Sequence, residues 1–277
     1  MILTKIITIF VKLLPDSFRY NHFNLIMGLI ISLLNHKGGV GKTTSAINIG
    51  AGLVELGKRV CLLDLDPQAN LTISLGLPRF PNTIYEALRG ESPLVPYPAK
   101  DNLDVIISTL DLSGAEMELI NEAGREYILK ELLDQIKDNY DFIIIDCPPS
   151  LGLLTLNSLT SSDYVLIPLQ TEFLAMQGLA KIKQVIQKVQ LRLNKDLQIA
   201  GVVATMYDQR KVLNRDVVDT IRKYFGELLF ETLIRDNVAL AEAPAQRKDI
   251  FAYSPSSPGS EDYLALCKEL LTRTGGA

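Results

Sequence analysis

A glycine-rich segment bounded by two lysines carries the most specific chemistry in the chain. It reads KGGVGKTT and comprises Lys37, Gly38, Gly39, Val40, Gly41, Lys42, Thr43 and Thr44. Glycines let the backbone turn its N–H groups toward an anion, and a following helix adds the positive end of its dipole. In such a loop, Lys42 reaches the terminal phosphates and the Thr43 hydroxyl ligates Mg²⁺. The segment therefore predicts a site for a nucleoside triphosphate and magnesium, although His36 stands where the common pattern has glycine.

Acidic residues at the ends of two strand patterns complete this predicted site. Asp146 closes the apolar run 142–145, and a buried strand of this kind delivers a carboxylate to Mg²⁺. The alternative is that Asp146 caps the proline-containing turn that follows it. Asp64 and Asp66 follow another apolar run, two residues apart. We expect Asp64 to support the metal, or simply to hydrogen-bond its own loop.

Alternating strand and helix patterns must bring these residues together. Apolar runs predict strands at 29–34, 59–64, 103–107, 141–146, 163–168, 198–205 and 228–234. Helical patterns lie between them, notably at 43–56, 124–138, 173–193 and 212–225, and a last helix covers 263–271. The order predicts an α/β fold, a mostly parallel sheet with helices on both faces. Ligands of such sheets bind at the carboxyl ends of the strands, where the loop and the aspartates fall.

Composition narrows the class of protein. The chain has 277 residues, 47% of them hydrophobic, which suffices for a large core. We expect a single domain over residues 28–277. Residues 1–27 are interpreted as an N-terminal extension, disordered or preceding a true start at Met27, with a membrane anchor as the less favoured alternative. Three scattered cysteines predict neither a disulfide scaffold nor a zinc site, and favour the cytoplasm.

Several segments together resemble one family. Residues 37–44 are similar to the deviant Walker A motif of the ParA/MinD ATPases. The segments 64–68 (DLDPQ), 141–150 (DFIIIDCPPS), 205–208 (TMYD) and 240–244 (LAEAP) resemble the ParA (Soj) branch in particular. The resemblance extends from about residue 29 to about residue 271. It implies a P-loop NTPase fold and an ATPase that uses ATP and Mg²⁺ in chromosome or plasmid partition, or in cargo positioning.

The resemblance also implies roles for particular residues. Lys37 would cross a dimer interface to the partner's nucleotide, as an arginine finger does. Asp66 would orient or activate the attacking water. ATP binding would then drive homodimerisation, and hydrolysis would be slow alone and stimulated by a ParB-like activator protein. In the family, such dimers coat the nucleoid through non-specific DNA binding.

Local charge gives modest support to DNA binding. The net charge of the chain is −4, but residues 181–223 contain ten basic and four acidic residues. Such a surface would hold phosphates without reading sequence; the alternative is an ordinary solvated helix face. The predicted DNA contacts are Arg210, Lys211 and Arg235. Two arginines of the family pattern are replaced here by Asp236 and Ala239, which weakens this expectation.

Three other functions fit the sequence less well than partition does. A membrane-cycling positioning ATPase like MinD needs a basic amphipathic tail, and residues 272–277 (TRTGGA) do not supply one, so membrane binding is not expected. A metal-cluster carrier of the nitrogenase iron-protein type needs interfacial cysteines, and Cys147 is poorly placed for that. A dehydrogenase would need a different glycine spacing and no phosphate-binding lysine.

Overall fold

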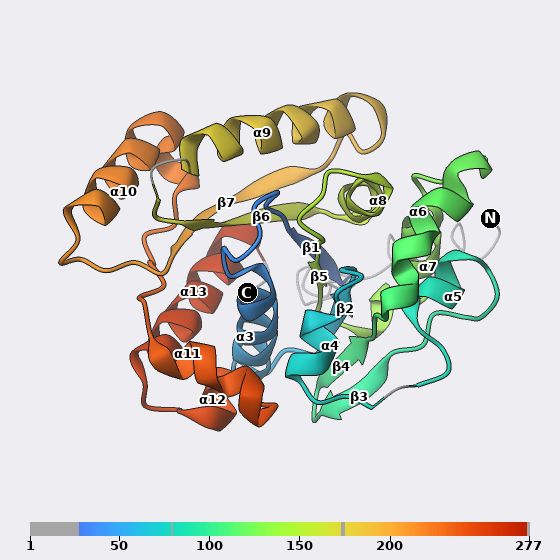
Figure 1. Cartoon of the computed structure of the whole chain (residues 1–277), viewed down its shortest axis with the longest axis horizontal. Coiled ribbons are helices and arrows are strands. Elements are labelled where there is room, and N and C mark those ends of the chain that lie inside the picture. The colour runs from blue at the N-terminus through green and yellow to red at the C-terminus, as the bar shows by residue number, and fades with distance from the viewer. Residues whose placement is uncertain (1–27, 79, 173–174, 276–277) are drawn as a thin grey trace, which may run out of the picture.

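A central sheet of seven strands organises the chain in the computed structural model, which describes residues 28–78, 80–172 and 175–275 (Figure 1). The strand order is β3-β4-β2-β5-β1-β6-β7, and β3 alone runs antiparallel to its neighbour. The strands are β1 (Leu29–Leu33), β2 (Val60–Asp64), β3 (Tyr97–Lys100), β4 (Leu103–Ile106), β5 (Phe142–Asp146), β6 (Tyr164–Gln170) and β7 (Gln198–Thr205). The expectations for residues 1–27 lie outside the described residues.

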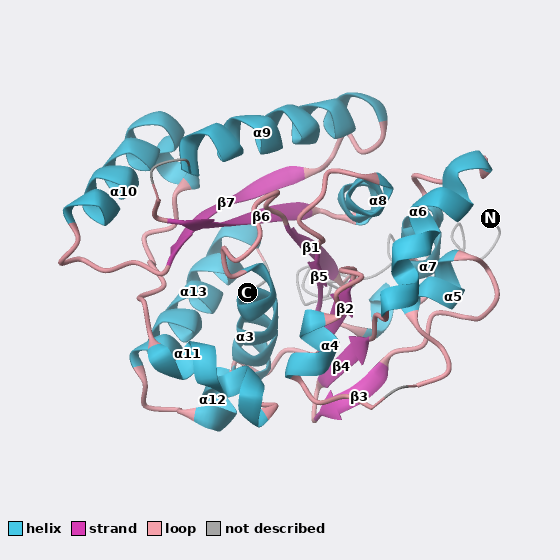
Figure 2. Cartoon of the chain, in the orientation of Figure 1, coloured by secondary structure: helices cyan, strands magenta, loops and turns pink. Residues whose placement is uncertain are grey.

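Helices flank the sheet on both sides, as Figure 2 shows by colour. The helices are α3 (Lys42–Glu55), α4 (Asn70–Ser74), α5 (Ile84–Leu88), α6 (Ala115–Glu118), α7 (Ile128–Leu133), α8 (Leu153–Ser161), α9 (Ala175–Arg192), α10 (Val212–Phe225), α11 (Val238–Glu242), α12 (Ile250–Tyr253) and α13 (Pro258–Thr274). Short 3₁₀ turns cover Leu110–Gly114, Leu119–Asn121, Lys137–Asn139, Gly226–Leu228 and Ala243–Gln246.

Strand β5 shows why the sheet has helices on both faces. Its side chains alternate, so Phe142 and Ile144 enter one hydrophobic cluster while Ile143 and Ile145 enter the other. The first cluster includes buried residues of α3 and α13, and the second includes those of α7, α8, α9 and α10. A strand buried on both faces reads as a continuous apolar run. The predicted fold class is therefore confirmed.

The prediction of a strand at 228–234 was wrong. This segment lies beside β7 but forms only one isolated bridge with it, between Val202 and Leu229. Side chains of α13 take up part of its backbone hydrogen bonding. The Glu269 carboxylate accepts from the Glu231 backbone N–H at 2.9 Å, and the Arg273 guanidinium donates to the Leu229 carbonyl at 2.9 Å. The buried apolar side chains of this segment pack against the core, although the segment is not a strand of the sheet.

Two other differences concern local backbone. The helix predicted at 124–138 is confined to Ile128–Leu133, followed by the short 3₁₀ turn at Lys137–Asn139. No strand is predicted at 97–100, yet Tyr97–Lys100 forms strand β3 at the edge of the sheet. Pro98 lies in that strand, and an edge strand tolerates proline because one side of it lacks a partner.

Candidate nucleotide site

Strand register brings the predicted site together at one edge of the sheet. In the parallel ladders, Asp146 of β5 is in register with Leu33 at the end of β1 and with Asp64 at the end of β2. The glycine-rich loop follows β1 and leads into α3 (Figure 1). Thr43 of the loop and Asp146 are 103 residues apart in the sequence. They meet because both lie at the carboxyl ends of the strands.

The loop backbone has the conformation that glycine permits. Gly39 and Gly41 have φ angles of 75° and 86°, in the left-handed region that other residues rarely adopt. A Cβ added at Gly39 would meet no atom within 4 Å, so open space lies beside the backbone there. The Thr205 hydroxyl donates to the Val40 carbonyl at 2.8 Å, which ties the loop to the end of β7. The loop is thus a shaped cradle with room beside its backbone.

The first turn of α3 carries the two side chains expected to meet the phosphates and the metal, Lys42 buried and Thr43 half-buried. Lys42 is only 7% exposed, and its ammonium donates to the Lys37 carbonyl at 3.3 Å. Burial lowers the pKa of Lys42, and the nearby Asp146 opposes that shift. The Thr43 hydroxyl donates to Asp146 Oδ2 at 2.7 Å. These contacts place Lys42, Thr43 and Asp146 in one site.

Asp146 offers the best test of whether the site fits a cation. Its Oδ1 atom is buried and has no hydrogen-bond partner among the described residues. Burial, reinforced by the neighbouring Asp64, raises the pKa of Asp146 to about 8. An orphaned carboxylate oxygen in a low-dielectric site is costly unless a cation or proton meets it. Together with the Thr43 hydroxyl it provides the hard oxygen ligands that Mg²⁺ prefers.

Asp64 and Asp66 have different surroundings. Asp64 is fully buried, and its Oδ2 accepts from the Thr72 backbone N–H at 2.9 Å and from the Thr72 hydroxyl at 2.7 Å. It therefore fastens the loop after β2 to α4, in line with the loop-bonding alternative. Asp66 Oδ1 accepts from the Gln68 N–H at 2.9 Å, and the Ser108 hydroxyl donates to the Asp66 carbonyl at 2.9 Å. The Asp66 carboxylate thus lies on a loop fixed by hydrogen bonds, near Asp146.

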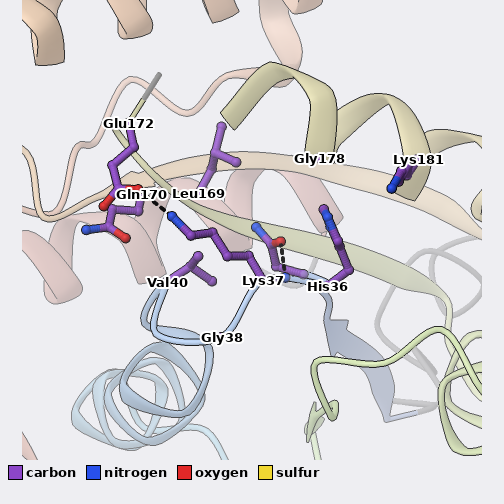
Figure 3. A pocket seen from close by; sticks show the side chains of 10 residues that line it. His36, Lys37, Gly38, Val40, Leu169, Gln170, Glu172, Gly178 and Lys181 are labelled. Atoms are coloured by element: carbon purple, nitrogen blue, oxygen red, sulfur yellow. Dashed lines mark hydrogen bonds and ion pairs between the residues drawn. The ribbon is translucent and has the colours of Figure 1, made fainter. Parts of the chain in front are cut away.

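Lys37 lies at the opposite, exposed side of the loop. Its side chain is 48% exposed, and its ammonium pairs with the Glu172 carboxylate after β6 (Figure 3). Both line a cavity of about 500 Å³ that also includes His36, Gly178 and Lys181. No local sequence pattern points to Glu172, because it lies 135 residues from Lys37 in the chain.

A second cavity, of about 220 Å³, adjoins the loop on the other side and was not anticipated. It is lined by Gly41 and Thr44 from the loop and α3, and by residues 205–206, 234–237 and 240–241 from two distant segments. Met206 adopts a left-handed backbone there, with φ 53°. The family resemblance at 205–208 and 240–244 is the sequence signal that could have indicated this cavity. Position and apolar lining suit a flat ring attached to the phosphates.

The predicted basic residues are distributed over α9, α10 and the loops that flank these helices (Figure 1). All ten are exposed: Lys181, Lys183, Lys188, Arg192, Lys195, Arg210, Lys211, Arg215, Arg222 and Lys223, called here the basic surface. Some are already paired. Arg210 is 86% exposed and binds the Asp208 carboxylate through Nε and Nη2, each at 2.9 Å.

Arg235, which is also a predicted DNA contact, forms ion pairs with two carboxylates of α13. Its guanidinium donates to Asp262 at 2.7 Å through Nη2 and at 3.0 Å through Nε, and it also pairs with Glu261 at 3.1 Å. These carboxylates raise the pKa of Arg235 further, Asp262 most. Asp262 is largely buried on α13. The arginine is thus occupied within the fold, next to the smaller cavity.

The cysteines bear on the metal-cluster alternative, and the helix lengths bear on membrane insertion. Cys61, Cys147 and Cys267 are unbridged and fully buried, and burial raises the pKa of Cys147 to about 12. None of these thiols is available at the surface to share a cluster between two copies. Within residues 28–78, 80–172 and 175–275, no helix has both the length and the apolar character needed to cross a bilayer.

Fold and site together define a P-loop nucleotide hydrolase with a second lysine at the entrance of its phosphate loop. A family model described as an AAA domain matches residues 28–199. The sporulation initiation inhibitor protein Soj of Bacillus subtilis is 47% identical over 88% of this chain and 98% of its own length. The chromosome-partitioning ATPase Soj of Treponema pallidum is 46% identical over 90% and 99%.

A solved structure supports the same assignment of fold. Cobyrinic acid a,c-diamide synthase from Mycobacterium smegmatis, with a bound ATP analog and magnesium, superposes with a TM-score of 0.79 at 36% identity, over 90% of this chain and 96% of that one. The chain belongs to the ParA/Soj family of chromosome-partitioning ATPases. The family resemblance inferred from the sequence is therefore confirmed.

Proposed function

We propose that this chain is an ATP-dependent dimerising switch that acts in chromosome or plasmid partition. The observation that carries the proposal is the opposite placement of the two loop lysines. Lys42 is buried beside Asp146, whereas Lys37 is half exposed at the surface. One protomer already has its phosphate lysine in Lys42. A second cation at the exposed entrance is suited to a nucleotide held by a second copy.

The residues present fit ATP and Mg²⁺. The loop N–H groups and Lys42 would hold the phosphates, and the smaller cavity would take the base. Thr43 and Asp146 would hold Mg²⁺, which supplies charge neutralisation at the phosphates. Asp66 would orient or activate the attacking water. Hydrolysis yields ADP and phosphate.

Turnover would be slow in an isolated protomer, because the second cation comes only from a partner. A transition state that lacks such a cation is slowed about 10³- to 10⁵-fold in other phosphate-loop enzymes. A ParB-like activator would then accelerate hydrolysis in the dimer by stabilising the arrangement of Lys37 and Asp66. Release of phosphate would weaken the dimer and reset the switch.

The decisive experiment traps the dimer. Asp66→Ala protein, saturated with ATP and Mg²⁺, is expected to run as a dimer in size-exclusion chromatography with light scattering. The Asp66→Ala/Lys37→Ala double variant is the matched control and is expected to bind ATP yet remain monomeric. A monomeric Asp66→Ala protein under saturating Mg·ATP would refute the switch.

Binding of the ATP dimer to DNA is the second part of the proposal, and the exposed basic surface supports it. Dimerisation doubles that surface, and its electrostatic attraction for phosphates is independent of sequence. Such binding would associate the protein with the nucleoid. The membrane-cycling alternative has less support, because the similar Treponema pallidum protein is named a chromosome-partitioning ATPase.

A further inference from the structure

The ammonium group of Lys37 has a definite partner in the separate protomer. Figure 3 shows the Lys37 side chain extended across the cavity entrance to Glu172, in the segment between β6 and α9. The side chains of Lys37 and Glu172 are 48% and 45% exposed. Exposed ion pairs usually contribute little. The question is whether this pair is incidental or built into the fold.

The backbone at the lysine end is fixed by a buried asparagine. Asn35 is 2% exposed, and its Oδ1 accepts from the Lys37 backbone N–H at 3.0 Å. Its Nδ2 donates to the Pro168 carbonyl in β6 at 2.8 Å. One side chain therefore connects the start of the loop to the strand that leads to Glu172.

The backbone at the glutamate end is fixed in a similar way. Asn214 of α10 is 7% exposed, and its Nδ2 donates to the Thr171 carbonyl at 2.8 Å. The Glu172 N–H donates to the Gln170 carbonyl at 2.8 Å. Because both backbones are held by buried contacts, only the two side chains must be ordered to form the pair. This lowers the entropic cost of pairing.

We propose that Glu172 is a positioning residue that holds Lys37 in cis and restrains the separate protomer from offering this cation to a second copy. The inference rests on the proposed function. In the dimer, Lys37 would have to leave Glu172 to approach the partner's phosphates. Two Lys37–Glu172 pairs must break for each dimer formed, so the free-energy cost of breaking one pair applies twice. Glu172 thereby sets the threshold of ATP-driven assembly.

The test removes the negative charge and keeps the shape. Glu172→Gln is introduced into the Asp66→Ala protein, and the dimer dissociation constant is measured by analytical ultracentrifugation in saturating Mg·ATP. An exposed pair is worth about 1.4- to 5-fold per protomer, so the dimer is expected to tighten about 2- to 30-fold. The gain should shrink as salt is raised, because salt already screens the pair in the parent.

Two controls separate this role from a general effect of charge. Glu231→Gln removes another exposed ion-pair acid, bonded to Arg222 at 3.0 Å, and is expected to leave the constant unchanged. In the Asp66→Ala/Lys37→Ala background, adding Glu172→Gln should leave the protein monomeric. An unchanged or weaker dimer in Glu172→Gln, with a normal parent dimer, would overturn this inference alone. Absence of any ATP-driven dimer in parent and variant would overturn the proposed function together with it.

Discussion

The nucleotide site and the basic surface use charge in opposite ways. Lys42 and Asp146 are both buried in the nucleotide site. The Lys42 ammonium donates to one backbone carbonyl, and one carboxylate oxygen of Asp146 has no hydrogen-bond partner among the described residues. The basic residues of α9 and α10 are exposed and numerous, and each is replaceable in principle. In a low-dielectric site one charge dominates the energy, whereas at a solvated surface many weak contacts add. Substitutions should therefore act steeply in the first region and gradually in the second.

The largest expected effect is from Lys42→Ala. Removing the buried ammonium leaves the phosphates without their close cation and leaves Asp146 without a compensating charge. ATP affinity, measured by isothermal titration calorimetry, should fall at least about 100-fold, on the scale of lost buried charge pairs. The matched control is Lys268→Ala at an exposed position of α13, for which affinity should not change. Retention of near-parental ATP affinity in Lys42→Ala would contradict the placement of the triphosphate.

A graded loss is expected at the basic surface. Lys183→Glu, Lys188→Glu and Arg192→Glu on α9 each reverse one exposed charge. Binding of the Asp66→Ala Mg·ATP dimer to random-sequence duplex DNA should weaken stepwise as the reversals accumulate. Removing three phosphate contacts lowers the slope of log affinity against log salt by about 2 to 3 per protomer. Fluorescence anisotropy at several salt concentrations measures both quantities. Full affinity in the triple variant would remove α9 from the DNA surface.

Sequence reasoning succeeded where function depends on local spacing and on the parallel-sheet rule. The loop residues follow one another, and Asp146 follows a run of four apolar residues. Since parallel strands end at a common edge, their meeting could be foreseen. The ion pair of Lys37 with Glu172 could not, because it depends on where β6 ends relative to the loop. The same holds for Arg235, whose partner Asp262 lies 27 residues away on α13.

Asp146 should reveal a conflict between stability and function in protein free of magnesium. Its folded pKa of about 8 exceeds the unfolded value of about 3.9. The folded state therefore retains a proton that the unfolded chain releases, so this group lowers stability as pH rises from about 4 to about 8. Asp146→Asn lacks that charge and should unfold at higher urea concentration than the parent at pH 8. We expect a gain of about 1 to 3 kcal/mol that vanishes toward pH 4.

Equilibrium urea unfolding in EDTA at several pH values measures this difference. Asp216→Asn, at an exposed position of α10, is the control and should track the parent at every pH. The same Asp146→Asn protein should lose the effect of Mg²⁺ on ATP affinity. Parallel pH profiles for parent and Asp146→Asn would show that no ionisation of Asp146 is linked to folding.

The smallest expected effects concern Arg210 and Arg235, which are both predicted DNA contacts. Arg235 is bonded to Asp262 on α13, whereas Arg210 reaches into solvent beside Asp208. Arg235→Ala should lower unfolding stability by about 1 kcal/mol, since Asp262 loses its cation, and leave DNA affinity almost unchanged. Arg210→Ala should leave stability unchanged and weaken DNA binding by about 2- to 5-fold, as one exposed contact would. The reverse pattern would mean that Arg235 leaves Asp262 when DNA binds, and that the basic surface extends to the smaller cavity.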